Sequence, residues 1–221
     1  MTRRSLLAFA AAVPVAAQEI HHGRNHPNPH HHRSAEEWAR ILESPDRDPW
    51  QKPDEVVAAL DLHAGQTAAD IGAGSGYFSV RLAKAVGPNG KVYAVDIQQD
   101  LIDHLTARAG EAGLTQMEPV LGTPDDPKLP AASVDLIFIC DVAHHIENRQ
   151  AYYAKLGRAL RPGGRIAIVD FYKKELPVGP GVAMKISREE MIAELGQAGF
   201  ALAAEHDFLP YQYFLTFTAK S

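Results

Sequence analysis

Cysteine is almost absent from this chain of 221 residues, which contains only Cys140. A single cysteine excludes an intrachain disulfide framework, and no Cys-x-x-Cys pair is present for redox or metal chemistry. Cys140 ends an apolar run that starts at Leu136. We therefore expect this cysteine to be a buried structural thiol.

Basic charge is also scarce, since 22 Lys and Arg face 27 Asp and Glu and give a net charge of −5. The sequence has no run of basic residues with interleaved aromatic residues, which is a common feature of surfaces that bind polyanions. The composition therefore predicts no nucleic-acid partner. A hydrophobic content of 46% at this length is enough to bury one substantial core.

No apolar run at the start of the chain is long enough to span a bilayer. The stretch from Leu6 to Ala17 follows two arginines, and small residues at Val15 and Ala17 suit cleavage before Gln18. This pattern resembles a signal peptide of the twin-arginine type, so we expect an exported, periplasmic protein without stable membrane insertion once the leader is removed. The alternative is a disordered or amphipathic start on a cytoplasmic protein.

Six of the eleven histidines lie in residues 18–33, which also contain Pro27 and Pro29. This arm cannot form a packed core, and it has two interpretations: a solvated linker, or a binder of Zn, Cu or Ni. We assign no metal ligand. After the arm, Ser34 and Glu37 form a capping-box signature for a helix. The chain thus divides into a leader (1–17), the arm (18–33) and one domain with an N-terminal helical cap (34–221).

Short apolar runs alternate with amphipathic stretches in the domain. Such alternation predicts parallel strands joined by right-handed helical crossovers. The last two strands have only a tight connection around Pro210 and must be antiparallel. The fold class is therefore α/β, a Rossmann-like doubly wound seven-stranded sheet, mostly parallel with an antiparallel C-terminal strand. Expected strands cover 68–72, 92–96, 117–121, 134–140, 165–171, 200–206 and 211–217, and expected helices cover 53–60, 77–86, 101–112 and 149–160, with another starting at Ser187.

A glycine-rich turn from Asp70 to Tyr77 closes the first strand and opens a helix. Its glycines allow a sharp bend and close approach of a ligand, and the helix start favours a carboxylate. The spacing is Gly-x-Gly-x-Gly, which differs from the Gly-x-Gly-x-x-Gly fingerprint of dinucleotide binding. Asp96 ends the next strand, where a carboxylate can accept hydrogen bonds from both hydroxyls of a ribose.

Residues 67–172 as a set resemble the class I S-adenosylmethionine-dependent methyltransferases, the family that includes small-molecule and quinone-type enzymes. The resemblance implies S-adenosylmethionine as cofactor. It places Asp96 on the ribose, Ile97 on the adenine, Asp125 or, less favoured, Asp126 on the adenine amino group, and Asp141 beside the cofactor. The methionyl part would be held by the glycine turn, namely Asp70, Gly72, Ala73, Gly74, Gly76 and Tyr77.

Methyl transfer from a sulfonium is an in-line displacement with an activated leaving group, so alignment can supply roughly 7 to 11 kcal/mol and no catalytic residue is obligatory. For a hydroxyl or phenol acceptor, a base is useful, and His144 or His145 is the candidate. Tyr77, Tyr211 and Tyr213 either line the acceptor pocket or pack in the core.

Trp38, Trp50 and Gln51 are candidates for a lid over the cofactor edge, with core packing as the alternative for both tryptophans. The resulting interpretation is a methyltransferase that acts on a small-molecule acceptor. The alternatives are an exported protein that binds S-adenosylmethionine or metal without turnover, and an NAD(P)-dependent oxidoreductase, which the glycine spacing and the antiparallel tail oppose.

Overall fold

A computed structural model describes residues 34–220. The leader, the histidine-rich arm and the predictions made for them lie outside the described residues. The helices are α1 (Ala35–Leu42), α2 (Asp48–Gln51), α3 (Pro53–Ala59), α4 (Ser79–Val86), α5 (Gln99–Glu111), α6 (Arg149–Ala159) and α7 (Arg188–Gln197), with short 3₁₀ turns η1 (Ala143–His145) and η2 (Val182–Met184).

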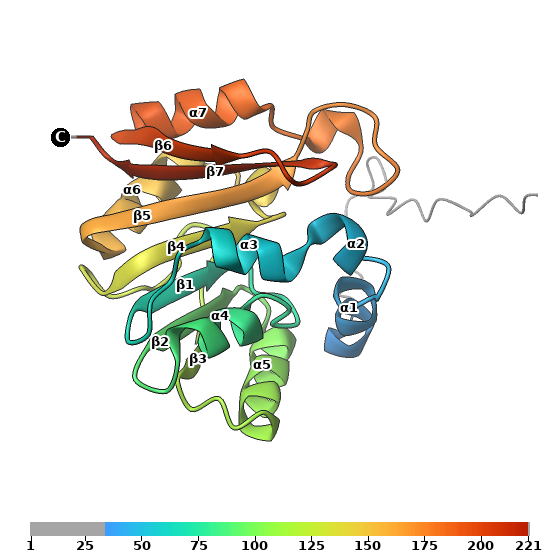
Figure 1. Ribbon diagram of the computed structural model, residues 1–221, viewed down its shortest axis with the longest axis vertical. Coiled ribbons are helices and arrows are strands. Elements are labelled where there is room, and N and C mark those ends of the chain that lie inside the picture. The colour runs from blue at the N-terminus through green and yellow to red at the C-terminus, as the bar shows by residue number, and fades with distance from the viewer. Residues whose placement is uncertain (1–33, 221) are drawn as a thin grey trace, which may run out of the picture.

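Seven strands form one sheet at the centre of the domain (Figure 1). They are β1 (Thr67–Ile71), β2 (Lys91–Asp96), β3 (Met117–Leu121), β4 (Val134–Cys140), β5 (Leu160–Phe171), β6 (Phe200–His206) and β7 (Gln212–Ala219). Their spatial order is β3-β2-β1-β4-β5-β7-β6, and β7 runs antiparallel to both of its neighbours. The predicted fold class, including the antiparallel C-terminal strand, is confirmed.

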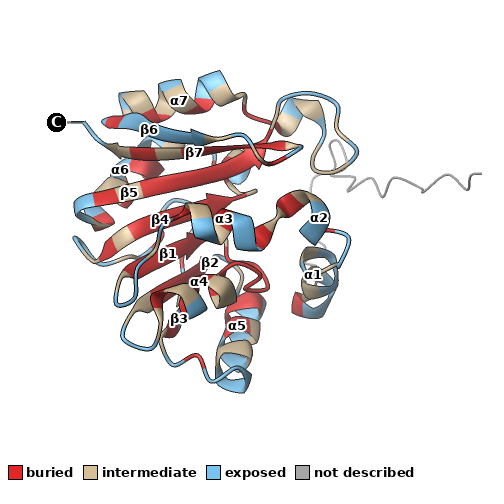
Figure 2. Ribbon diagram, in the orientation of Figure 1, coloured by how far each residue is buried: buried red, intermediate tan, exposed pale blue. Residues whose placement is uncertain are grey.

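Successive residues of a strand point to opposite faces, so both faces of the central strands are apolar. Ala68 faces a core built with α3, α4 and α5, whereas its neighbour Ala69 faces a second core built with α6 and α7. Figure 2 shows the result: the central strands are buried, and exposed residues lie on the outer faces of the helices. The burial explains why these strands appear in the sequence as nearly continuous apolar runs.

Element boundaries differ from the predictions where local sequence is ambiguous. The fifth strand starts at Leu160 and not at residue 165 as predicted. Leu160 pairs with β4, and pairing resumes at Arg165. Residues 161–164 between them therefore form a bulge in the strand. Helix α4 starts at Ser79, two residues later than predicted, because the glycine turn extends through Phe78.

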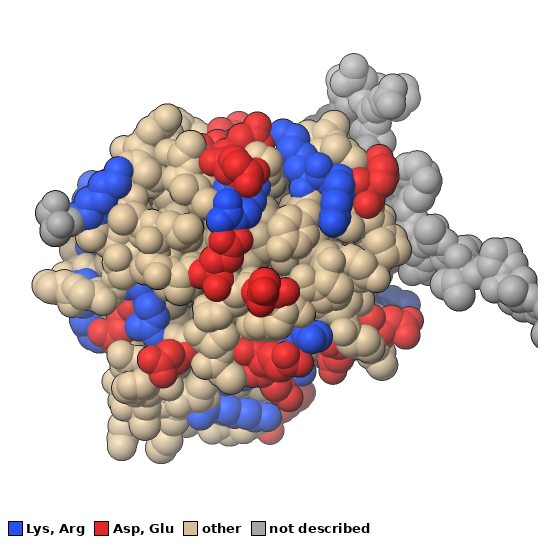
Figure 3. Space-filling view, turned by 45° about the horizontal axis from the view of Figure 1, so that its top comes forward, with Lys and Arg blue, Asp and Glu red and all other residues tan. Residues whose placement is uncertain are grey.

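The predicted capping box of Ser34 with Glu37 is present, and the helix predicted to start at Ser187 begins with a second capping box, which Ser187 forms with Glu190. Within residues 34–220, no helix has the length and apolar character needed to cross a membrane. On the face shown in Figure 3, basic and acidic side chains are interspersed and no continuous basic band is seen.

Candidate active site

The carboxyl ends of β1 and β4 form the central edge of the site. These strands are neighbours, and the chain leaves β1 toward the α4 face but leaves β4 toward the α6 face. The two departing segments thus lead to opposite faces of the sheet, and such a switch point is where doubly wound sheets bind ligands. The glycine turn follows β1, and the segment from Asp141 to His145 follows β4.

The glycine turn is tightly packed against both neighbouring segments. Gly72 has φ +72°, and a Cβ atom there would lie 2.3 Å from Cγ2 of Val142. Gly74 has φ +57°, and a Cβ atom there would lie 2.7 Å from Cδ1 of Leu42 in α1. Only glycine combines this backbone conformation with so close an approach, so the turn is shaped by Val142 on one side and by Leu42 on the other.

Asp96 is bonded directly to the glycine turn. Its carboxylate accepts hydrogen bonds from the backbone N–H groups of Gly74 (2.9 Å), Ile97 (2.7 Å) and Gln98 (3.1 Å). Burial raises the pKa of Asp96, while these bonds oppose the shift. A carboxylate offers about four acceptor positions, so one remains for a ligand hydroxyl. Ile97 beside it is 55% exposed, an apolar surface open to a ligand.

Two further groups of the turn are buried. Asp70 lies beneath the turn and accepts a hydrogen bond from the Ser79 hydroxyl at 2.6 Å, and burial raises its pKa to about 6. Asp70 is thus also a structural anchor of the turn. Ser75 is fully buried, and among residues 34–220 its Oγ has no hydrogen-bond partner. An unpaired buried hydroxyl is costly, and a ligand that supplied a partner would remove that cost.

Asp125 and Asp126 follow β3, in a segment that starts beside Asp96 through the bond from Gly122 N to Asp96 O. The carboxylate of Asp125 accepts from the Thr123 hydroxyl at 2.7 Å and forms an ion pair with Lys155 at 3.6 Å. The Asp125 side chain is 80% exposed. Its contact with an adenine amino group stays a prediction.

Residues 34–52, which we call the N-terminal cover, close over the glycine turn. Tyr77 at the end of the turn donates a hydrogen bond to Asp48 of α2, and the Arg47 guanidinium lies 4.2 Å from the centre of the Tyr77 ring. Arg108 of α5 bonds both Glu43 of the cover and the Ser75 carbonyl of the turn. The cover therefore lies where the sequence predicted a lid.

Asp141 has φ +59°, which places its side chain at the edge of the sheet. Its carboxylate accepts from Gln212 and forms an ion pair with Arg47 at 3.4 Å. Gln51 bonds Arg47 at 3.1 Å and Gln212 at 2.8 Å, and its amide lies 3.6 Å from the buried Cys140 sulfur. Burial raises the pKa of Asp141 to about 6, although the Arg47 charge acts in the opposite direction.

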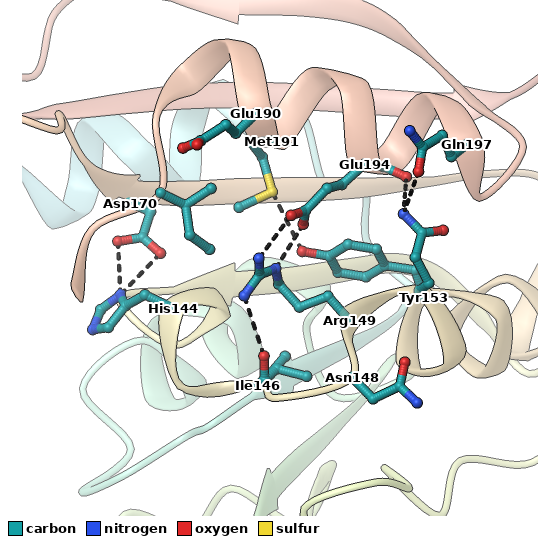
Figure 4. A network of polar contacts seen from close by, with 12 residues as sticks. His144, Ile146, Asn148, Arg149, Tyr153, Asp170, Glu190, Met191, Glu194 and Gln197 are labelled. Atoms are coloured by element: carbon teal, nitrogen blue, oxygen red, sulfur yellow. Dashed lines mark hydrogen bonds and ion pairs between the residues drawn. The ribbon is translucent and has the colours of Figure 1, made fainter. Parts of the chain in front are cut away.

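His144 and Asp170 form a buried pair at the ends of β4 and β5 (Figure 4). His144 Nδ1 lies 2.9 and 3.0 Å from the two carboxylate oxygens, and Asp170 also accepts from Phe171 N at 2.8 Å. An ionised carboxylate only accepts, so Nδ1 carries the hydrogen and the neutral ring keeps Nε2 as an acceptor. Burial lowers the pKa of His144, but Asp170 outweighs burial and the net shift is upward.

The remaining candidates are divided between the edge and the core. Trp50 of the cover lies 5.8 Å from Phe171 and 6.4 Å from Tyr211 between ring centres, so these aromatic residues form one wall. Tyr213 is fully buried and bonds the Ile186 carbonyl, which supports the packing interpretation for it. His145 is exposed, with its ring 4.2 Å from that of His144.

Three residues at this edge were missed from sequence: Arg47, Asp170 and Gln212. Asp170 lies near the carboxyl end of a predicted strand, a position that could have identified it. Arg47 and Gln212 carry no local signal, because their partner Asp141 is 94 and 71 residues away in the chain.

Comparison with known proteins gives consistent matches. A methyltransferase domain family matches residues 62–206. The 27-O-demethylrifamycin SV methyltransferase of Amycolatopsis mediterranei is 30% identical over 172 residues, which cover 72% of this chain and 62% of that protein. Nocamycin O-methyltransferase of Saccharothrix syringae is 30% identical over 160 residues, covering 69% and 57%. The chain spans about three fifths of the length of these curated relatives.

A solved structure of a SAM-dependent methyltransferase from Aquifex aeolicus superposes with a TM-score of 0.78 at 27% identity. The match covers 82% of this chain and 96% of that one. The similarity therefore extends over nearly all of the described domain, including the antiparallel end of the sheet.

Proposed function

Because the chain belongs to the class I S-adenosylmethionine-dependent methyltransferases, we propose that it methylates an oxygen atom of a small organic acceptor. The observation that carries the proposal is the direct bond between the glycine turn and Asp96 at the edge where the His144–Asp170 pair also lies. The names of two relatives, which specify O-methyl transfer, support oxygen as the acceptor atom.

S-adenosylmethionine supplies an activated methyl group on a sulfonium sulfur. The residues at the edge fit this cofactor: Asp96 keeps one acceptor position for a ribose hydroxyl, and Ile97 exposes apolar surface for the adenine. The unpaired Ser75 hydroxyl offers one further polar contact on the turn.

Arg47 and Asp141 fit the amino-acid part of the cofactor, which carries a carboxylate and an ammonium group. Their ion pair of 3.4 Å is longer than the 2.7 to 2.9 Å typical of charge-assisted bonds. The negative charge of Asp141 is also incompletely stabilised by its neighbours, as its raised pKa indicates. We assign Arg47 to the carboxylate and Asp141 to the ammonium, so that a zwitterionic ligand would exchange one loose ion pair for two closer ones.

His144 is the proposed general base. Asp170 orients the ring through Nδ1 and leaves Nε2 to take the proton of an acceptor hydroxyl. The acceptor oxygen gains the methyl carbon, its proton passes to Nε2, and the departing sulfur keeps the electron pair of the broken bond. His145, exposed on the same 3₁₀ turn, is the less suitable base because the ring that Asp170 orients is that of His144.

Calorimetric titration of the chain with S-adenosylhomocysteine, 5′-methylthioadenosine and NADH tests the cofactor assignment. We expect S-adenosylhomocysteine to bind, and Arg47→Met to weaken it about ten- to a hundredfold, as loss of a charged hydrogen bond does. Methylthioadenosine lacks the amino-acid part, so its affinity should stay within about twofold. Arg40→Met in α1, an exposed arginine of the same cover, is the matched control.

Binding of NADH without S-adenosylhomocysteine would reject the proposed function. Equal losses for both nucleosides in Arg47→Met would reject only the role of Arg47. Transfer of a labelled methyl group to small molecules of a cell extract would then identify the acceptor.

A further inference from the structure

Lys185 is a buried cation that the proposed chemistry does not use. It follows η2 in the segment between β5 and α7 and is 3% exposed. Its ammonium donates to the Lys174 carbonyl at 2.8 Å. Within residues 34–220 it forms no ion pair of 4.0 Å or less, and the carboxylates of Glu175 and Asp170 act on it from farther away. An ammonium has three donors, so the one carbonyl leaves two hydrogen atoms available. Burial of a charge without an ionic partner is unfavourable unless a ligand supplies an opposite charge or a hydrogen-bond acceptor.

The surroundings of Lys185 place it on the acceptor side of the site. Its Nζ lies 5.8 Å from the centre of the Phe171 ring, and Phe171 directly follows Asp170. Burial lowers the pKa of Lys185, and the charges of Glu175 and Asp170 oppose that shift. The Lys185 charge in turn acts to lower the pKa of His144, so Lys185 interacts with both members of the His144–Asp170 pair. Figure 1 shows the segment between β5 and α7 at the same end of the sheet as α2.

An aromatic wall stands next to this cation. Phe171 contacts Trp50, which in turn contacts Tyr211. Gly179 approaches the Phe171 ring so closely that a Cβ atom there would lie 2.7 Å from it, so the segment that carries Lys185 is held against the wall. Aromatic side chains next to an unpaired cation are suited to a planar ring that carries negative charge.

We propose that Lys185 binds an anionic oxygen of the acceptor, and that the acceptor is an aromatic ring bearing a carboxylate in addition to the hydroxyl that is methylated. The inference rests on the proposed function and adds its substrate class. Lys185 would then be a specificity-determining residue: its ammonium holds the carboxylate while His144 faces the hydroxyl.

The experiment measures binding to the protein saturated with S-adenosylhomocysteine, so turnover is not required. The ligands are 2-, 3- and 4-hydroxybenzoate and the corresponding neutral hydroxybenzamides, followed by calorimetry. We expect at least one acid to bind about tenfold or more tightly than its amide, since a charged hydrogen bond is lost in the amide.

The variants separate charge from structure. Lys185→Met should remove the preference for the acid, whereas Lys185→Arg should retain most of it. Lys174→Met changes an exposed neighbour whose backbone carbonyl still accepts from Lys185, so it should leave the preference unchanged. The affinity for S-adenosylhomocysteine should be the same in all three variants.

Equal affinity of the wild type for acid and amide would overturn the inference, as would failure of all three acids to bind. An equal loss for acid and amide in Lys185→Met would show that Lys185 only ties down its segment. If Lys185→Met does not fold, the wild type and Lys185→Arg still decide the matter. Failure of S-adenosylhomocysteine to bind at all is a different result and would reject the proposed function itself.

Discussion

Replacement of Asp170 by Asn tests the proposed base without knowledge of the acceptor. Asp170 is fully buried and accepts from both His144 Nδ1 and Phe171 N. Asn keeps an oxygen at the position that accepts from both groups, but it carries no charge, and its amide nitrogen cannot accept from the imidazole. The hydrogen bond between the pair therefore becomes a neutral one, and because bonds to charged groups contribute about 1.5 to 3 kcal/mol against about 0.5 to 1.5 kcal/mol for neutral bonds, we expect a cost of about 1 kcal/mol.

The substitution should also reverse the direction of the His144 pKa shift. In the wild type, Asp170 outweighs burial and holds the pKa of His144 above its ordinary value of about 6.5. In Asp170→Asn, burial remains and the carboxylate charge is gone, so the pKa should fall below that value. Titration of the imidazole C–H resonance by NMR, assigned with a His144→Gln variant, measures both values.

The pH dependence of stability has a definite sign. Because the folded-state pKa of His144 is raised, its stabilisation is fully present below the unfolded value of about 6.5 and is lost as pH rises through the folded value. The cost of Asp170→Asn, measured by urea unfolding, should therefore be larger at pH 6 than at pH 8. An unchanged His144 pKa together with equal costs at the two pH values would refute the coupling of the pair.

Three further predictions concern the cofactor edge. Asp96→Ala should weaken S-adenosylhomocysteine binding by about 1.5 to 3 kcal/mol, and an unchanged dissociation constant in calorimetry would remove Asp96 from the site. Gly74→Ala should cost about 1 to 2 kcal/mol of unfolding free energy because φ is +57°, and adding Leu42→Ala should restore only the small part that comes from the close contact. Asp141 has its pKa raised to about 6 by burial, so it makes stability fall as pH rises from about 4 to 6; Asp70, whose pKa is also raised to about 6, contributes in the same direction, so Asp141→Asn should make the decline in urea unfolding shallower without abolishing it, and an unchanged decline would contradict the burial argument.

Much of the fold follows from local sequence. Apolar runs predicted β1, β2 and β4 to within one residue, because parallel strands buried on both faces tolerate few polar side chains. The bounds of the edge strand β3 were also predicted, although it is only partly buried. The helix starts at Ser34 and Ser187 were also predicted, because helix capping is set by residues only a few positions apart in the chain. The four-residue helix α2 was not predicted, since it is too short to produce a periodic pattern.

The glycine turn and Asp96 could be recognised as one site from sequence, because the carboxyl ends of adjacent parallel strands necessarily meet at one edge of the sheet. The same argument placed the histidines after β4. It did not distinguish His144 from His145, since that choice depends on which ring points to Asp170.

Tertiary structure alone decided which charged side chains face one another across that edge. The pairs Arg47 with Asp141 and His144 with Asp170 join residues 94 and 26 positions apart, and the unpaired Lys185 becomes meaningful only beside the second pair. Backbone preferences and apolar periodicity act over a few neighbouring residues, whereas the energy of a buried charge depends on groups that the fold brings together from distant parts of the chain.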